Sequence, residues 1–139
     1  MNTPRDLSTI STGDSLPATR YTPDNIQLFF YNAVLWNAHR IHYDLPYATQ
    51  VEGYPGLVIA GPMLGDWLGQ VADNWVGDAG IVEQLEYSNR QASFIGETLT
   101  TGGSITAVDV TGRRVSCDLF VKNEAGEIIT PGKAIVRFF

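Results

Sequence analysis

The sequence predicts an α+β fold in which antiparallel strands wrap around one apolar helix. Two observations favour this class. The first is a helical spacing of apolar residues, two tryptophans among them, that begins at Gly61-Pro62. The second is a series of strand-like segments between residues 81 and 139, separated by turn sequences. Because the helical patterns come first and the strands follow in one run, the order indicates α+β rather than alternating α/β architecture.

The composition indicates one globular domain. Of 139 residues, 44% are hydrophobic and 17% are charged. The net charge of −6, with nine Lys and Arg residues, argues against nucleic acid or an anionic membrane as a partner. No apolar run reaches the ~20 residues of a membrane span, and the N-terminus lacks the apolar core of a signal peptide. The single cysteine, Cys117, allows a reducing compartment, so we expect a cytoplasmic protein.

The N-terminal half predicts a tail, a short edge segment and two helices. Residues 1–11 are expected to form a flexible tail and residues 12–139 one domain. Thr22-Pro23-Asp24 has the composition of a helix start and predicts a helix over 23–36, followed by an ordered loop over 37–56. The second helix should end near Gly77. Apolar residues with helical spacing should form the buried face of the first helix: Ile26, Phe29, Phe30, Ala33 and Val34.

The C-terminal half predicts four strands, over 81–92, 97–110, 114–123 and 128–139. Gly102-Gly103 predicts a bulge or bend in the second strand, and Gly132 predicts a bulge in the fourth. The third strand has alternating apolar residues that should share one face: Val115, Cys117, Leu119 and Val121.

Eight residues between the two helices carry most of the candidate chemistry; they run from Asn37 to Asp44 and read Asn-Ala-His-Arg-Ile-His-Tyr-Asp. His42 suits the role of base or acid because its ordinary pKa lies near neutral pH. The amide of Asn37 can orient a water but takes up no proton at neutral pH. Gly61, at the start of the second helix, offers a free backbone N–H to a developing oxyanion. The pattern therefore predicts an acid/base site, with His39 and Asp44 as candidate accessory groups.

These motifs resemble the MaoC-like (R)-specific enoyl-CoA hydratases and acyl dehydratases. The stretch around His42 is most similar to the branch that includes mesaconyl-C(4)-CoA hydratase. The residues that carry the resemblance are Phe30-Tyr-Asn-Ala33, Asn37 to Asp44, Tyr47-Ala48, Gly53-Tyr-Pro-Gly56 and Gly61-Pro-Met-Leu64, with weaker signals at Leu85-Glu-Tyr87, Gly96-Glu-Thr-Leu99 and Gly132-Lys-Ala134.

The resemblance implies a single hotdog domain, in which a curved antiparallel sheet wraps around a central helix. It implies hydration of a 2-enoyl-CoA, or dehydration of a 3-hydroxyacyl-CoA, at the interface of a homodimer or heteromer. CoA enters as part of the substrate, and neither a further cofactor nor a metal is expected. His42 matches the family histidine. Asn37 stands where the family has an acid, His39 where it often has an amide, and Ala60 where it often has a polar residue.

Two sets of residues are candidates for binding the substrate. The acyl chain would lie between helix and sheet, against walls formed by Trp36, Leu57, Met63 and Trp67. The phosphates of the coenzyme would need cations, which the chain could supply from Arg90, Arg113, Arg114, Lys122 or Lys133.

Other functions stay open beside the hydratase. The loss of the family acid at Asn37 suits a non-catalytic subunit that completes the site of a partner. A thioesterase shares the fold and would need a carboxylate on or near the central helix, for which Asp66 and Asp73 are the candidates. A module that only binds acyl thioesters is a third alternative.

Overall fold

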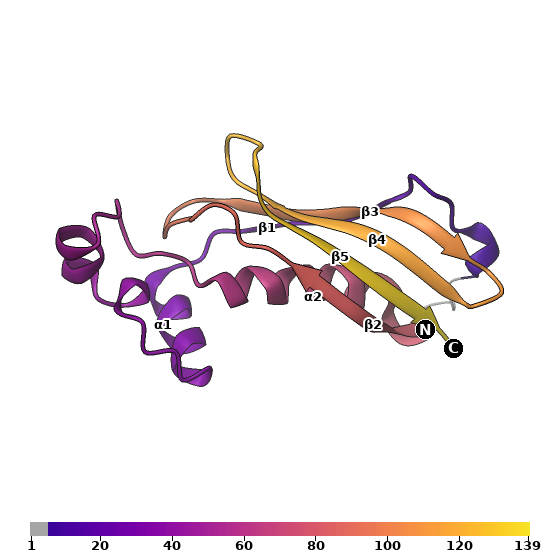
Figure 1. Cartoon of the computed structure of the whole chain (residues 1–139), viewed down its shortest axis with the longest axis horizontal. Helices are drawn as coiled ribbons and strands as arrows, with labels where there is room; N and C mark the ends of the chain where they lie inside the picture. Colours follow the sequence, from indigo (N-terminus) through magenta and orange to yellow (C-terminus); the bar gives the residue numbers. More distant parts are fainter. Residues whose placement is uncertain (1–5) are drawn as a thin grey trace.

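The computed structural model describes residues 6–139 and shows one five-stranded sheet with a long helix along one face (Figure 1). The strand order is β1-β3-β4-β5-β2, and every neighbouring pair is antiparallel. Helix α2, Gly61–Val76, packs against all five strands. The α+β class predicted from the sequence is confirmed. The strands are β1 (Ser15–Tyr21), β2 (Gly80–Tyr87), β3 (Leu99–Asp109), β4 (Arg114–Lys122) and β5 (Ile128–Phe138).

The core lies between α2 and the sheet. The indole of Trp67 stacks on the Tyr21 ring of β1 at 4.3 Å, and Trp75 meets Phe138 of β5 edge-on at 5.9 Å. The apolar residues of β4 that were predicted to share a face are all buried: Val115, Cys117, Leu119 and Val121. Helical periodicity and strand alternation therefore both identified the core correctly in this half of the chain.

Two glycines of the sheet allow close packing. Gly132 pairs in regular register with Leu119, and a Cβ there would lie 2.8 Å from Cδ1 of Leu68 on α2. Gly102 pairs regularly with Phe120 of β4, and a Cβ there would lie 2.8 Å from the Phe120 ring. The bulge predicted at Gly132 is wrong. The irregularity predicted at Gly102-Gly103 is found on the β1 side, where the pairing with β3 shifts between Leu16 and Thr19, opposite the stretch from Gly103 to Thr101. The pairing of β3 with β4 shifts separately, between Ile105 and Ala107.

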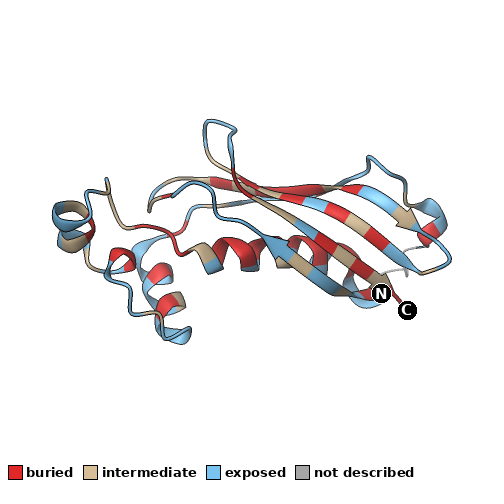
Figure 2. Cartoon of the chain, viewed as in Figure 1, coloured by how far each residue is buried: buried red, intermediate tan, exposed pale blue. Residues whose placement is uncertain are grey.

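Helix α1, Asn25–Val34, departs most from the sequence prediction. It begins after Asp24, whose carboxylate accepts a hydrogen bond from the Gln27 N–H at 2.7 Å, and not after Thr22. The face predicted to be buried is exposed, with Phe30 63% and Val34 85% accessible. The helix lies beyond one end of the sheet (Figures 1 and 2), and its buried residues are Leu28 and Asn32.

The segments before β1 and after α1 contain more regular structure than expected. Of the predicted tail, residues 1–5 lie outside the described residues, while Leu7–Thr9 form a 3₁₀ turn in which Leu7 packs into the core. The predicted loop contains a 3₁₀ turn, Arg40–His42, and a π-helical turn, Tyr47–Val51. No helix in the described part of the chain combines the length and apolar character needed to cross a membrane.

Candidate active site

His42 is a buried side chain with one ring nitrogen already used. It ends the 3₁₀ turn after α1 and is 6% exposed. Its Nδ1 lies 2.7 Å from the carbonyl oxygen of Val58. Because a carbonyl only accepts hydrogen bonds, Nδ1 carries the proton in the neutral ring and Nε2 keeps its lone pair. Burial lowers the pKa of His42; the hydrogen bond to Val58 opposes this shift and the neighbouring His39 adds to it, and the net direction is downward. His42 is therefore a neutral base at physiological pH.

A short extended segment, 57–59, holds the histidine in place. The N–H of Val58 donates to the carbonyl of Ile41 at 3.0 Å on the side of His42. On the other side, the N–H of Ile59 donates to the carbonyl of Ser93 at 2.9 Å. This small ladder joins the turn after α1 to the segment that leads into β3. Helix α2 begins two residues after Ile59, so the same ladder fixes where that helix starts.

His42 and Gly61 line one cavity of about 280 Å³. Gly61 is the first residue of α2, where backbone N–H groups lack partners within the helix. Two residues of the sequence-predicted site are thus brought together. The other lining residues are Ile41, Val58, Ile59, Leu64 and residues 89–93.

Residues 89–93 form a wall of this cavity, of which the sequence analysis named Arg90 alone. The predicted strand over 81–92 includes most of this wall, but β2 ends at Tyr87. Asn89 accepts a hydrogen bond at Oδ1 from the Thr130 hydroxyl at 3.0 Å. Ser93 is 1% exposed, and its Oγ has no hydrogen-bond partner among the described residues. The unbroken polar run 88–91 was the signal that these residues leave the sheet.

The side chain of Asn37 forms a hydrogen bond with a residue near the end of α1. Its Nδ2 donates to Oδ1 of Asn32 at 2.9 Å, and its Oδ1 accepts from the N–H of His39 at 3.2 Å. It is not among the residues that line the cavity. The ring of His39 meets His42 edge-on at 5.7 Å between centroids, with the rest of its side chain exposed. Asn37 therefore stabilises the backbone that carries both histidines.

Asp44 caps the loop that follows. Its carboxylate forms an ion pair with Arg40 at 2.7 Å and accepts from the N–H of Tyr47 at 3.1 Å. Hydrogen bonding from Arg40 lowers the pKa of Asp44, which keeps it ionised. The carboxylate therefore has a structural partner on each oxygen.

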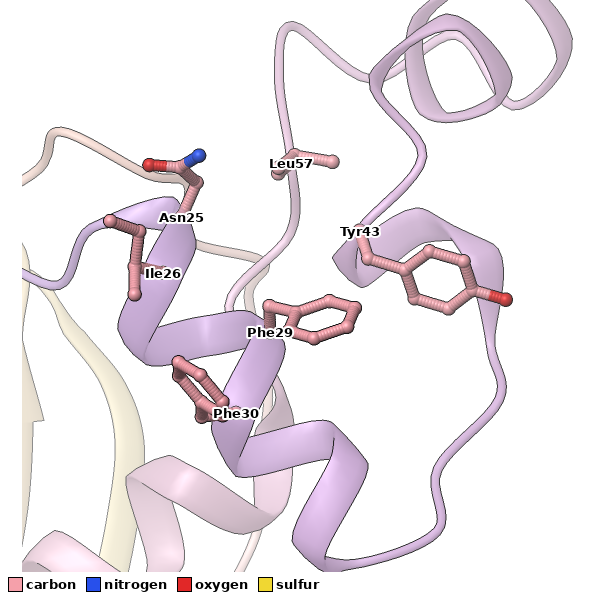
Figure 3. A pocket seen from close by; sticks show the side chains of 6 residues that line it. All are labelled: Asn25, Ile26, Phe29, Phe30, Tyr43 and Leu57. Atoms are coloured by element: carbon pink, nitrogen blue, oxygen red, sulfur yellow. The ribbon is translucent and has the colours of Figure 1, made fainter.

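The four candidate wall residues do not line the cavity of His42. Met63 and Trp67 belong to the core between α2 and the sheet, and Trp36 follows α1 with 92% of its surface exposed. Leu57 instead lines a groove of about 330 Å³ beside α1 (Figure 3). The other lining residues of this groove are Asn25, Ile26, Phe29, Phe30 and Tyr43.

One of the five candidate cations for the coenzyme phosphates, Arg90, lines the cavity of His42. Arg114 pairs with Glu83 at 2.7 Å on the sheet, and the Lys122 ammonium lies over the Phe120 ring.

The carboxylates of the thioesterase alternative lie elsewhere. Asp66 accepts a hydrogen bond from the Tyr31 hydroxyl at 2.5 Å, and neither it nor Asp73 lines the cavity. Within residues 6–139, no three His, Cys, Asp or Glu side chains are grouped so as to hold a metal ion.

Comparison with known proteins gives a family and a fold. A family model described as hydroxyacyl-thioester dehydratase type 2 matches residues 3–95. Mesaconyl-C(4)-CoA hydratase of Chloroflexus aurantiacus is 54% identical over 50 residues, which cover 36% of this chain and 18% of that protein. The chain thus spans less than a fifth of the length of this curated relative.

Two solved structures resemble the whole domain. The (R)-hydratase from A. caviae involved in PHA biosynthesis matches with a TM-score of 0.84 at 15% identity, over 94% of this chain and 98% of that chain. The ChsH1-ChsH2 complex from Mycobacterium tuberculosis matches with a TM-score of 0.82 at 13% identity, over 93% of this chain and 98% of that chain. These matches confirm the hotdog fold predicted from the sequence.

Proposed function

Because the chain belongs to the hydroxyacyl-thioester dehydratase type 2 family, we propose that it hydrates a 2-enoyl-CoA or, in reverse, dehydrates a 3-hydroxyacyl-CoA. The family and branch inferred from the sequence motifs are confirmed by the family model and by the mesaconyl-C(4)-CoA hydratase match. The observation that carries the proposal is the neutral, buried His42 in one cavity with the start of α2.

The chemistry follows from these two groups. Nε2 of His42 takes a proton from water while the water oxygen bonds to C3 of the enoyl group. The C2–C3 π electrons move toward C2, and negative charge develops on the thioester oxygen. The backbone N–H of Gly61 and the positive end of the α2 dipole stabilise that charge. The imidazolium then returns its proton to C2, which completes the 3-hydroxyacyl thioester. Dehydration runs through the same steps in reverse.

Three further parts of the proposal concern binding. Asn37 has one N–H and one lone pair left after its two hydrogen bonds, so its amide remains a candidate to orient the water. Arg90, the cation on the cavity wall, is suited to a phosphate of the coenzyme. The protein is expected in the cytoplasm and needs no metal or additional cofactor.

A second hotdog subunit completes the proposed enzyme, as a homodimer or a heteromer. The apolar face of α1 is exposed, with Ile26, Phe29, Phe30 and Val34 each more than half accessible, and a contiguous apolar surface of this kind is typical of an interface. One of the structural matches is itself named as a complex. The alternative that this chain is a non-catalytic subunit keeps one supporting observation, the amide at Asn37 in place of the family acid.

The absorbance of a conjugated 2-enoyl-CoA tests the proposal directly. Hydration removes the conjugation, so the absorbance of short, branched or bulky enoyl-CoA esters should fall when the purified chain is added. The loss should disappear in His42→Ala. A flat trace with every ester contradicts hydration by this chain alone, and release of free CoA thiol would identify a thioesterase instead.

A further inference from the structure

Asn89 lies directly against the start of α2. A Cβ built on Gly61 would collide with Nδ2 of Asn89 and would lie 3.1 Å from its Cγ. The two residues come from different elements, because Asn89 follows β2 whereas Gly61 opens the helix. Both line the cavity that contains His42. The absence of a side chain at Gly61 therefore leaves the space that the Asn89 amide occupies.

The orientation of this amide is set from the sheet. Thr130, a fully buried residue of β5, donates its hydroxyl hydrogen to Oδ1 of Asn89 at 3.0 Å. With the oxygen held by Thr130, the NH₂ group faces Gly61. No acceptor in the described part of the chain takes a hydrogen bond from Nδ2. Its two hydrogens are available to a ligand at the N-terminus of α2.

A second polar group on the same wall also lacks a partner. Ser93 Oγ is buried without a hydrogen bond among the described residues, which is uncommon for a buried hydroxyl. It lies on the same cavity wall as Asn89. Asn89 itself is exposed, so the buried hydroxyl of Ser93 is the observation that indicates a polar part of the ligand on this side of the cavity rather than an alkyl chain.

We propose that the side-chain amide of Asn89 is a second donor to the thioester oxygen, beside the backbone N–H of Gly61. This inference rests on the proposed acyl-thioester substrate. Two donors would share the negative charge that develops on this oxygen as water adds to C3. Loss of one donor of this kind lowers the rate by on the order of 10²–10³ in other enzymes.

Asn89→Asp provides the sharpest test, because the carboxylate keeps an acceptor for the Thr130 hydroxyl while it removes the NH₂ group. We expect kcat for enoyl-CoA hydration to fall at least ~10-fold, with KM changed much less. Asn89→Ala adds no charge and should show the same kcat loss. Asn74→Asp makes the same charge change on an exposed position of α2 and should leave kcat unchanged. Wild-type kcat in Asn89→Asp, or in folded Asn89→Ala, would overturn the proposal.

A second measurement needs no turnover. In His42→Ala, bound cinnamoyl-CoA should absorb at longer wavelength than free cinnamoyl-CoA, because donors at its carbonyl polarise the conjugated system. Adding Asn89→Asp should abolish most of this shift. An equal shift in both variants, or none in His42→Ala, contradicts the assignment. If the unmodified chain hydrates no ester, the proposed function fails, and this spectral comparison still decides the role of Asn89.

Discussion

His42 and Ser93 are fixed to opposite sides of one extended segment. Nδ1 of His42 donates to the carbonyl of Val58, and the next residue, Ile59, donates its N–H to the carbonyl of Ser93. Gly61 follows two residues later as the first residue of α2. The proposed base, the polar wall and the oxyanion donor are thus positioned by four consecutive residues, 58–61, so displacement of one is expected to displace the others.

Replacement of His42 is predicted to abolish most activity. General acid–base catalysis contributes about 10²–10⁴ in rate, so His42→Gln should lower kcat by at least ~100-fold. The loss of enoyl absorbance measures this effect. His39→Gln is the matched control, because the His39 ring only contacts the edge of the His42 ring. This substitution should lower kcat much less than His42→Gln. A larger loss in His39→Gln would assign the proton transfer to His39 instead.

The lowered pKa of His42 predicts how activity depends on pH. The neutral form of His42 is the active base in hydration. Burial lowers the pKa of His42 below its ordinary value of about 6.5, so the neutral form persists to lower pH. The acid limb of kcat/KM should therefore reach half of its maximum below pH 6.5. A half-maximal point above pH 6.5 would contradict a buried neutral base.

The same pKa shift predicts a change in stability. Between the native pKa of His42 and about 6.5, the unfolded chain binds more protons than the folded one. The free energy of unfolding should therefore fall as pH drops through that range, and His42 should contribute no pH dependence above it. Urea unfolding of the wild type and His42→Gln at pH 7.5 and 5.5 isolates this contribution. An equal loss in both proteins would contradict it.

Gly132→Ala is predicted to destabilise the fold. The new Cβ would lie 2.8 Å from Cδ1 of Leu68 and 3.0 Å from the carbonyl oxygen of Glu86. Overpacking of this kind costs about 1–3 kcal/mol, which urea unfolding can measure. Gly126→Ala is unsuited as a control because Gly126 has a positive φ, whereas Gly56 has open space and no positive φ. Gly56→Ala should therefore change stability much less than Gly132→Ala.

The exposed face of α1 predicts the state of association. If a second subunit covers it, Phe30→Asp should weaken or abolish the oligomer in sedimentation experiments, because a charge in an apolar interface loses its hydration. Glu124→Lys on an exposed turn is a control that should leave the mass unchanged. A monomeric wild type at micromolar concentration would contradict self-association through α1 and would favour a heteromer.

Sequence periodicity identified what a single chain buries. In α2 and β4 one face packs on the same core throughout, so the 3.6-residue and 2-residue repeats locate Leu68 and Val115 inside. The repeat in α1 has the same form, yet Phe29 is exposed because that helix lies beyond the end of the sheet. Periodicity reports an apolar face and does not report whether this chain or another subunit covers it.

Sequence motifs named some of the residues that line the candidate cavity and left others unnamed. His42 and Gly61 lie in recognisable stretches, and they share a cavity as expected. Asn89 and Ser93 belong to a wall that exists only because β2 ends early and the chain turns back toward α2. Their meeting with Gly61 depends on tertiary contacts between distant segments, which no local sequence pattern encodes.

The single cysteine has a practical consequence for assays of this protein. Cys117 is buried in β4, and burial raises the pKa of its thiol to about 11, so little reactive thiolate forms at neutral pH. A colorimetric thiol reagent added to the folded chain should therefore report free coenzyme and almost nothing else. The same reagent should react with the protein once it unfolds, so one solution can report both thioester cleavage and loss of structure.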